Sequence, residues 1–394
     1  MTRVRLGLAG LLVVSLAGCA GSASTSGSPV ASAVASANAA PSLVAPTVSP
    51  RPSPSLAMGW RVVATRSDLA TASLKDMTTF RGSLIAVGTA TDAPLGVIWS
   101  SPDGEVWTSI AGATPLDGAS LNAVAVGDPG IVVVGWSETN AVALFSPDGT
   151  LWSRQQLPGS HAGSSIVSVA WRQGRFVAVG GGGEPGAVVS WMSDDGRTWI
   201  PVSIFAEGNQ ASLNSVAAGP DGFVADGMYR RHPAIWTSPD GKAWKRSDLP
   251  GSTADDPGRL RFAGGHFFLP LIFLPLSGGD LLCSTDGQRW SRTTVPGFGV
   301  GIFDVAVIPG GFVAIGRSSE GSEPIPGSYV PGVVTTADGD LTRWTQQPAD
   351  AAMSGALASS ALISPDGTYL VGVGMSISGE SVFLLPKPSV PASQ

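Results

Sequence analysis

Ser146-Pro147-Asp148-Gly149-Thr150-Leu151-Trp152 decides the fold, because close versions of this stretch recur along the chain of 394 residues. The shared pattern is Ser or Thr, any residue, Asp, Gly, a short spacer and Trp, and we call it the Asp-Gly turn motif. Steps of 45 to 47 residues separate the first five copies, and the sixth copy follows after 52. A period of about 45 residues is typical of a four-stranded propeller blade. The Asp residues of the six copies are Asp103, Asp148, Asp195, Asp240, Asp286 and Asp338.

Two apolar segments precede each copy of the motif and indicate strands. The nearer segment usually ends in glycine, as in residues 84–88, 176–180 and 312–316. Short runs of this kind, rich in β-branched residues and bounded by Gly, Pro and Asp, favour β-strands. Each unit is therefore predicted to contain four strands, with the Asp-Gly turn before the fourth and a Trp at the start of that strand.

The two ends of the repeat complete each other. Residues 356–385 supply three predicted strands and no fourth, whereas residues 60–64 look like an isolated fourth strand with its leading Trp. We therefore predict an all-β fold over residues 59–386, a seven-bladed β-propeller of four-stranded antiparallel blades. In it the N-terminal strand closes the last blade, which removes the exposed edges of an open sheet.

The residues of the motif have local structural roles. Asp in a tight turn accepts backbone N–H groups, Gly supplies a positive φ, and Trp packs between blades with its N–H on a carbonyl. The motif resembles the Asp-box, or BNR, repeat of sialidases, sortilin-type receptors and photosystem assembly propellers, over roughly residues 60–386. The resemblance implies that these turns lie on the outer rim of one face and are structural, not catalytic.

The amino end has the features of an export signal. Arg3 and Arg5 precede a short apolar run, which ends in Leu16-Ala17-Gly18-Cys19 and resembles the bacterial lipobox. We predict a lipoprotein signal peptide over residues 1–18, an acylated Cys19 and a disordered Ala/Ser/Pro tether over residues 19–58. Residues 387–394 are predicted to be a flexible tail. The protein is thus expected on the outer face of a bacterial cytoplasmic membrane, anchored by lipid.

Composition limits the function. Only 13% of residues are charged and the formal net charge is −6, so no basic surface for nucleic acid is expected. A sialidase would need an arginine triad and a Tyr/Glu pair, but the chain has three Tyr residues and lacks the early Arg-Ile-Pro signature. We predict a non-catalytic, monomeric module that binds a protein or glycan, without cofactor or metal. The alternative is a sialidase-like glycoside hydrolase using the loop carboxylates Asp92, Asp117, Glu138, Glu184, Glu207, Asp255, Asp256, Glu320, Glu323 and Asp350.

Three loops that depart from the repeat are the candidate binding sites. The fourth unit carries the densest basic patch, which suits an anion or carboxylate clamp, or else is a solvated loop. The fifth unit has an apolar extension where other units are polar, which predicts a docking surface, or else an insertion packed on a neighbouring blade. The sixth unit has a long insertion with further polar residues. The residues are Tyr229, Arg230, Arg231 and His232; Ile272, Phe273, Leu274 and Leu276; and Glu320, Glu323 and Tyr329, respectively.

Overall fold

The structure is a computed structural model, and almost everything it describes is β-strand or tight turn. It describes residues 61–63, 72–90, 96–104, 106–110, 116, 118–138, 140–181, 190–202, 211–230, 232–249, 256–272, 279–298, 301–308, 311–318, 330–336, 340–346, 356–363, 370–376 and 379–385. The chain divides into a unit of residues 1–52 and a unit of residues 53–394, and all described residues belong to the second. No helix of the described part is long and apolar enough to cross a membrane.

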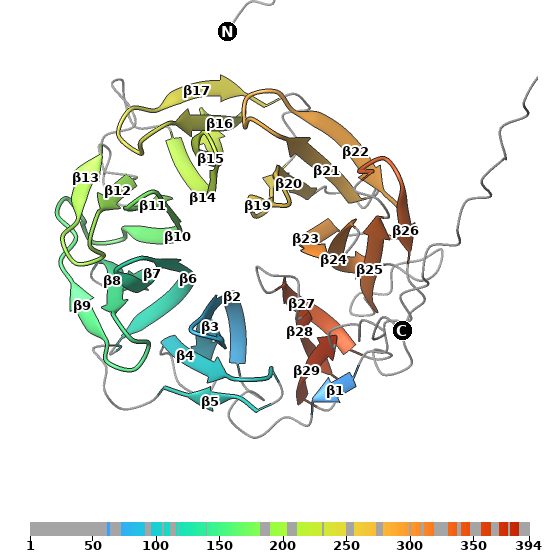
Figure 1. Cartoon of the computed structure of the whole chain (residues 1–394), viewed down its shortest axis with the longest axis horizontal. Coiled ribbons are helices and arrows are strands. Elements are labelled where there is room, and N and C mark those ends of the chain that lie inside the picture. Colours follow the sequence, from blue (N-terminus) through green and yellow to red (C-terminus); the bar gives the residue numbers. More distant parts are fainter. Residues whose placement is uncertain are drawn as a thin grey trace, which may run out of the picture. The chain divides into compact units, whose positions relative to one another are not determined.

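The fold is an all-β propeller whose blades are antiparallel sheets of four strands (Figure 1). In four of the sheets the strands lie in sequence order from the innermost to the outermost, as predicted. Their strands are β2 (Ala72–Phe80), β3 (Ser83–Ala90), β4 (Gly96–Ser101) and β5 (Thr108–Ser109); β6 (Ala119–Gly127), β7 (Gly130–Ser137), β8 (Ala141–Ser146) and β9 (Ser153–Gln155); β10 (Ser165–Arg172), β11 (Arg175–Gly181), β12 (Ser190–Ser193) and β13 (Ile200–Val202); and β14 (Ala211–Gly219), β15 (Gly222–Tyr229), β16 (His232–Ser238) and β17 (Lys245–Asp248).

The next two sheets continue the pattern, and one of them has a broken inner strand. In that sheet β18 (Asp256–Pro257) and β19 (Arg261–Ala263) both pair with β20 (His266–Ile272). Pro257 and Pro270 each lack a backbone N–H, so a continuous ladder there would lose hydrogen bonds. The remaining strands are β21 (Gly279–Ser284) and β22 (Ser291–Val295), then β23 (Gly301–Ile308), β24 (Gly311–Ser318), β25 (Val330–Thr336) and β26 (Trp344–Gln346).

A further sheet joins the start of the described chain to its end. It has the order β1 (Arg61–Val63), β29 (Gly379–Leu385), β28 (Leu370–Ser376) and β27 (Ala356–Ile363). β1 runs antiparallel to β29, with Arg61 opposite Leu384 and Val63 opposite Val382. The described residues thus form seven hydrogen-bonded sheets, and Figure 1 shows them arranged around a common centre.

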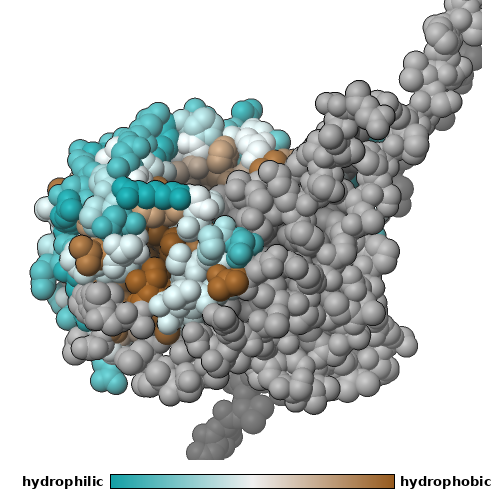
Figure 2. Space-filling view, turned by 60° about the horizontal axis from the view of Figure 1, so that its bottom comes forward, coloured by the Kyte–Doolittle hydropathy of each residue, from teal (hydrophilic) through white to brown (hydrophobic). Residues whose placement is uncertain are grey.

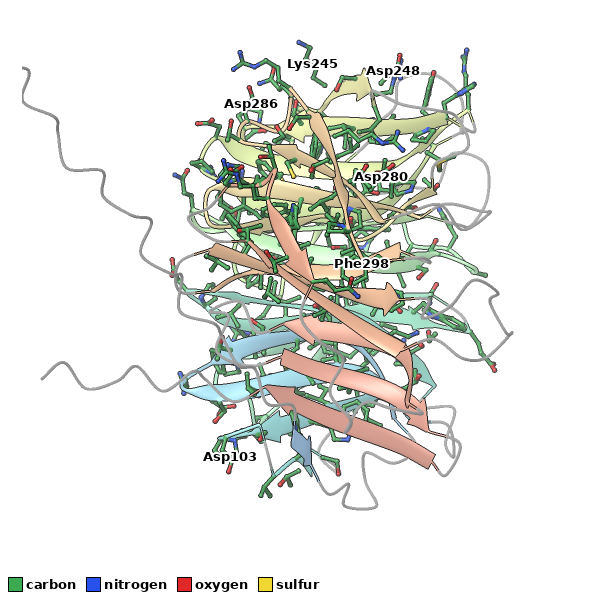
Figure 3. All side chains as sticks on the ribbon, turned by 90° about the vertical axis from the view of Figure 1, so that its right-hand side faces the viewer. Asp103, Lys245, Asp248, Asp280, Asp286 and Phe298 are labelled. Atoms are coloured by element: carbon green, nitrogen blue, oxygen red, sulfur yellow. The ribbon has the colours of Figure 1, made fainter. Side chains whose placement is uncertain are left out.

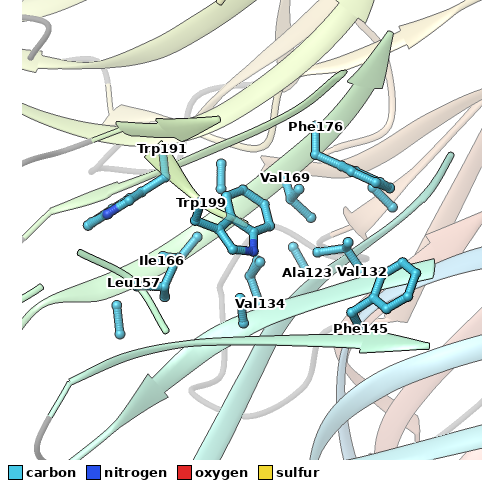
Figure 4. Packing of buried hydrophobic residues seen from close by; sticks show 14 residues of the cluster. Ala123, Val132, Val134, Phe145, Leu157, Ile166, Val169, Phe176, Trp191 and Trp199 are labelled. Carbon is cyan, nitrogen blue, oxygen red and sulfur yellow. The ribbon is translucent and has the colours of Figure 1, made fainter. Parts of the chain in front are cut away.

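The hydrophobic core lies between neighbouring sheets. Figure 4 shows one such layer, in which Val132 and Phe145 of the β6–β9 sheet face Phe176, Trp191 and Trp199 of the β10–β13 sheet. Large aromatic side chains fill these wedge-shaped spaces and supply much of the buried apolar area. A second set of tryptophans, on the third strands of three sheets, is almost fully buried, although the repeat analysis did not single it out: Trp99, Trp191 and Trp236.

The inner strands share a register shift that aims polar side chains at the next sheet. β2, β10 and β14 each shift register just before Asp76, Ser168 and Ser215. Asp76 Oδ2 accepts the backbone N–H of Val124 at 3.0 Å. In the same way Ser168 Oγ accepts that of Val216 at 3.1 Å. A bulge is a regular device for redirecting a side chain in this way, and here it ties inner strands of adjacent sheets together.

We expect Ser168→Ala to lower the free energy of unfolding by about 1 kcal/mol, because it leaves the buried Val216 N–H without its acceptor. Urea denaturation of the full chain measures this loss. The matched control is Ser153→Ala, since Ser153 is exposed and lies on the outer strand β9. If Ser168→Ala loses no more stability than the control, then Ser168 does not tie the two inner strands together as we infer.

Candidate functional site

The Asp-Gly turns are held together by their own side chains. In the second copy, Ser146 Oγ accepts the N–H of Gly149 at 2.8 Å, and Asp148 Oδ1 accepts those of Thr150 and Leu151 at 2.8 and 3.1 Å. These hydrogen bonds hold the pKa of Asp148 far below its usual range. Asp103, Asp195, Asp240 and Asp286 accept turn N–H groups in the same manner.

The glycine of the motif takes the backbone conformation that the repeat predicts. Gly104, Gly149, Gly196, Gly241 and Gly287 have φ values between 70° and 84°. This left-handed region disfavours residues with a Cβ. The Trp of the motif often closes the turn, as Trp107 Nε1 donates to the carbonyl of Gly104 at 2.8 Å. The carboxylates of these turns are therefore engaged in structure.

In the sixth copy the turn is made by Asp340. Thr342 N–H donates to Asp340 Oδ1 at 2.9 Å, and Trp344 Nε1 donates to the carbonyl of Leu341 at 2.8 Å. Asp340 stands four residues before Trp344, as Asp148 does before Trp152. The expected Asp338 lies outside the described residues. The Asp that makes the turn is thus the one four residues before the Trp, because the Trp packs between blades and fixes the position of the turn.

The basic patch of the fourth unit forms a tight hairpin with an aromatic centre. Tyr229 ends β15 and pairs with His232 of β16, and Arg230 follows with φ +49°. The guanidinium carbon of Arg230 lies 5.2 Å from the centroid of the Tyr229 ring, and that of Arg246 lies 4.4 Å from it. Arg246 also forms an ion pair with Asp248. We call Tyr229, Arg230 and Arg246 the Tyr229 clamp.

The clamp lies at the end of the sheet opposite the Asp-Gly turn. Figure 3, a side view, places the labelled Asp103 and Asp286 toward one face of the described part and Asp248 toward the other. Arg230 is exposed, and no carboxylate of the described chain forms an ion pair with it. Cation–π contact orients both guanidiniums; the Arg230 guanidinium has no ion pair with a described carboxylate, whereas Arg246 donates from Nη1 to Asp248. The clamp can therefore bind an anionic group.

The described residues include only some of the predicted site residues. Ile272 ends β20, and His232 begins β16 with an exposed side chain. Among the loop carboxylates weighed for hydrolysis, only Glu138 has a described side chain, and it is exposed. The predicted site residues that lie outside the described residues are Cys19, Arg231, Phe273, Leu274, Leu276, Glu320, Glu323 and Tyr329.

A buried ion-pair cluster near the centre of the propeller was not predicted. Arg261 donates from Nε to Asp304 Oδ1 at 2.8 Å and from Nη2 to Asp304 Oδ2 and Asp76 Oδ1, both at 3.1 Å. Arg259 Nη1 lies 3.1 Å from Asp76 Oδ1 and donates to the carbonyl of Lys75 at 2.6 Å. The side chains of Asp76 and Asp304 are only 4% and 2% exposed. Two positive and two negative side chains thus meet, three of them on the inner strands β2, β19 and β23 and Arg259 between β18 and β19, and we call these four residues the central cluster.

Burial alone would lower the pKa of Arg261, but the carboxylates of Asp304 and Asp76 raise it above its usual value. Arg261 therefore stays charged. One sequence signal could have pointed to the central cluster: Asp76 and Asp304 interrupt apolar inner strands at equivalent positions, opposite Val87 and Ile315. A carboxylate at such a position needs a buried partner.

The described residues contain no group of three or more His, Cys, Asp or Glu side chains placed to hold a metal ion. Cys283 is buried on β21, and its burial raises the pKa of the thiol to about 12. This cysteine packs as a small apolar residue.

Comparisons with known proteins identify the fold. No protein-family model matches the chain, and no curated protein matches it significantly. Among solved structures, one described as YCF48 bound to D1 peptide matches with a TM-score of 0.55 and 16% identity, covering 86% of this chain and 97% of that one. A streptogramin B lyase matches with a TM-score of 0.55 and 10% identity, covering 82% and 96%. The WD40 domain of Neurospora crassa Pan2 matches with a TM-score of 0.53 and 10% identity, covering 84% and 95%. These likenesses show a β-propeller.

Proposed function

We propose that this protein is a non-catalytic propeller that binds a protein partner through an acidic segment, held by the Tyr229 clamp. The observation that carries the proposal is the pair of guanidiniums, 5.2 and 4.4 Å from one Tyr ring at the exposed end of a sheet. Arg forks suit carboxylates because two N–H groups meet two oxygens. A propeller of similar fold is described as bound to a peptide, which supports the same use here.

The proposed scaffold is a closed ring of seven blades of the Asp-box type. Its support is the seven sheets of the described residues, the pairing of β1 with β29, and the recurrent Asp-Gly turns. Each blade of such a ring leaves only a short outer strand as a sheet edge, so a partner meets loops and hairpins such as β15–β16 more readily than an open strand.

We expect the full chain to bind a fluorescent Glu-rich peptide and to lose about tenfold in affinity in Arg230→Ala or Arg246→Ala, the loss of one charge-assisted hydrogen bond. Fluorescence anisotropy measures both affinities, and the binding should weaken with added salt. The control is Arg289→Ala, because Arg289 is also an exposed arginine but lies in an Asp-Gly turn. Equal binding by the clamp variants and the control would refute the proposal, as would equal binding of a Lys-rich peptide.

We further propose that acylated Cys19 anchors the protein to the outer face of a bacterial cytoplasmic membrane. The support is the Leu16-Ala17-Gly18-Cys19 sequence after a short apolar run. Cys19→Ser should abolish labelling by an alkyne-tagged fatty acid and release the protein from the membrane fraction. A variant that keeps both would show that the anchor is elsewhere.

A further inference from the structure

The centre of the propeller contains a cavity of about 270 Å³. Residues of the inner strands β6, β10, β14, β19 and β23 line it. In the coloured part of Figure 2, hydrophobic residues gather inside the hollow and hydrophilic ones cover the rim. An apolar cavity of about 150 Å³ is enough for one benzene ring, so this space admits a small organic molecule.

The cavity exists because most units have a small side chain at one equivalent position of the inner strand. Ala125, Ala170, Ala217 and Ala306 occupy this position, and all four line the cavity. The fifth unit breaks the pattern: Arg261 pairs with Phe268 as Ala170 pairs with Val177 and Ala217 with Val224. One long cationic side chain therefore enters a space that alanines leave open.

Arg261 forms part of the cavity wall and has one amino group to spare. Its Nε and Nη2 face the carboxylates of Asp304 and Asp76. Its Nη1 makes no hydrogen bond with any residue of the described chain, and the side chain is 25% exposed. The two carboxylates hold the guanidinium in place, and because Arg261 lines the cavity its Nη1 is pre-organised for a ligand bound there.

We propose that the cavity binds a small monocarboxylate with a short apolar chain. The carboxylate accepts hydrogen bonds from Arg261 Nη1, and the chain lies on the alanine side chains and against Trp171 and Phe262. The alanine, valine and aromatic side chains of the wall contact the hydrocarbon part, and a guanidinium prefers a carboxylate to a neutral amide or an ammonium. This site is separate from the Tyr229 clamp and independent of peptide binding.

Isothermal titration of the full chain with hexanoate, hexanamide and hexylamine tests the proposal. Hexanoate should bind saturably and about tenfold tighter than hexanamide, and hexylamine should not bind. Ala217→Leu should abolish hexanoate binding, because the larger side chain fills the cavity while the central cluster stays intact. Ala243→Leu is the matched control: Ala243 is exposed in an Asp-Gly turn, where the second copy of the motif already has Leu151.

Circular dichroism checks the folding of each variant, and Ala306→Val supplies a smaller obstruction if Ala217→Leu does not fold. Hexanoate binding that is retained in the control and lost in a folded, obstructed variant supports the site. The proposal is overturned by absent hexanoate binding, by equal binding in the obstructed variant, or by hexanamide binding as well as hexanoate.

Discussion

Arg261→Ala should lower the free energy of unfolding by about 3–5 kcal/mol, because it leaves the buried carboxylate of Asp304 without its cation. Alanine is sterically acceptable there, since Ala170, Ala217 and Ala306 occupy the equivalent position. The loss is therefore electrostatic more than steric. Urea denaturation followed by tryptophan fluorescence measures it. Arg289→Ala is the control, because the Arg289 side chain is 91% exposed and such surface ion pairs contribute little.

The double variant Arg261→Ala with Asp304→Ala distinguishes a coupled cluster from independent contacts. It removes one charge of each sign and leaves the Arg259–Asp76 pair, which lies 3.1 Å apart. Ala123 already occupies the position equivalent to Asp304 in the second sheet. We expect the double variant to be more stable than Arg261→Ala alone, since no buried charge is left unpaired. Additive losses from the two single variants would contradict this coupling.

The local part of this molecule could be predicted from sequence. The turn motif predicted the order of the strands and the hydrogen bonds of each turn. This was possible because those hydrogen bonds join residues no more than four apart, such as Asp148 with Thr150 and Leu151. In the sixth copy Asp338 lies outside the described residues, and the described part of the turn uses Asp340, four residues before Trp344, which the sequence analysis did not single out.

The clamp was predicted in part. Tyr229 and Arg230 are neighbours in sequence, whereas Arg246 joins them only because β17 pairs with β16. The central cluster was harder still to predict from the sequence. Arg261 and Asp76 are 185 residues apart, and ring geometry alone brings them within hydrogen-bond distance. The two aspartates could have been noticed as polar interruptions of apolar strands, but the sequence analysis did not single them out and could not have identified their partners.

Asp226→Asn should stabilise the protein at pH 8 while changing its stability little at pH 4. Asp226 is fully buried on β15, where other sheets have Val87, Val134 and Val179. Ser215 donates a hydrogen bond to its Oδ1, but no described residue hydrogen-bonds its Oδ2. Burial raises the pKa of this carboxyl from 3.8 to about 7. The wild-type residue is therefore a buried charge at pH 8 and a neutral acid at pH 4.

The sign of the pH dependence follows from that shift. Because the folded chain holds the proton more tightly than the unfolded chain, the stability from protonated Asp226 is complete below about pH 4 and is lost as the pH rises to about 7. At about 1.4 kcal/mol per pKa unit, the wild type should lose up to about 4 kcal/mol relative to Asp226→Asn over this window. Urea denaturation from pH 4 to 8 gives the difference, with the exposed Asp221→Asn as control. A difference that is flat with pH would mean that folding leaves the pKa of Asp226 unshifted, and one that grows toward acid would mean that the folded protein stabilises the ionised carboxylate; either result contradicts the prediction.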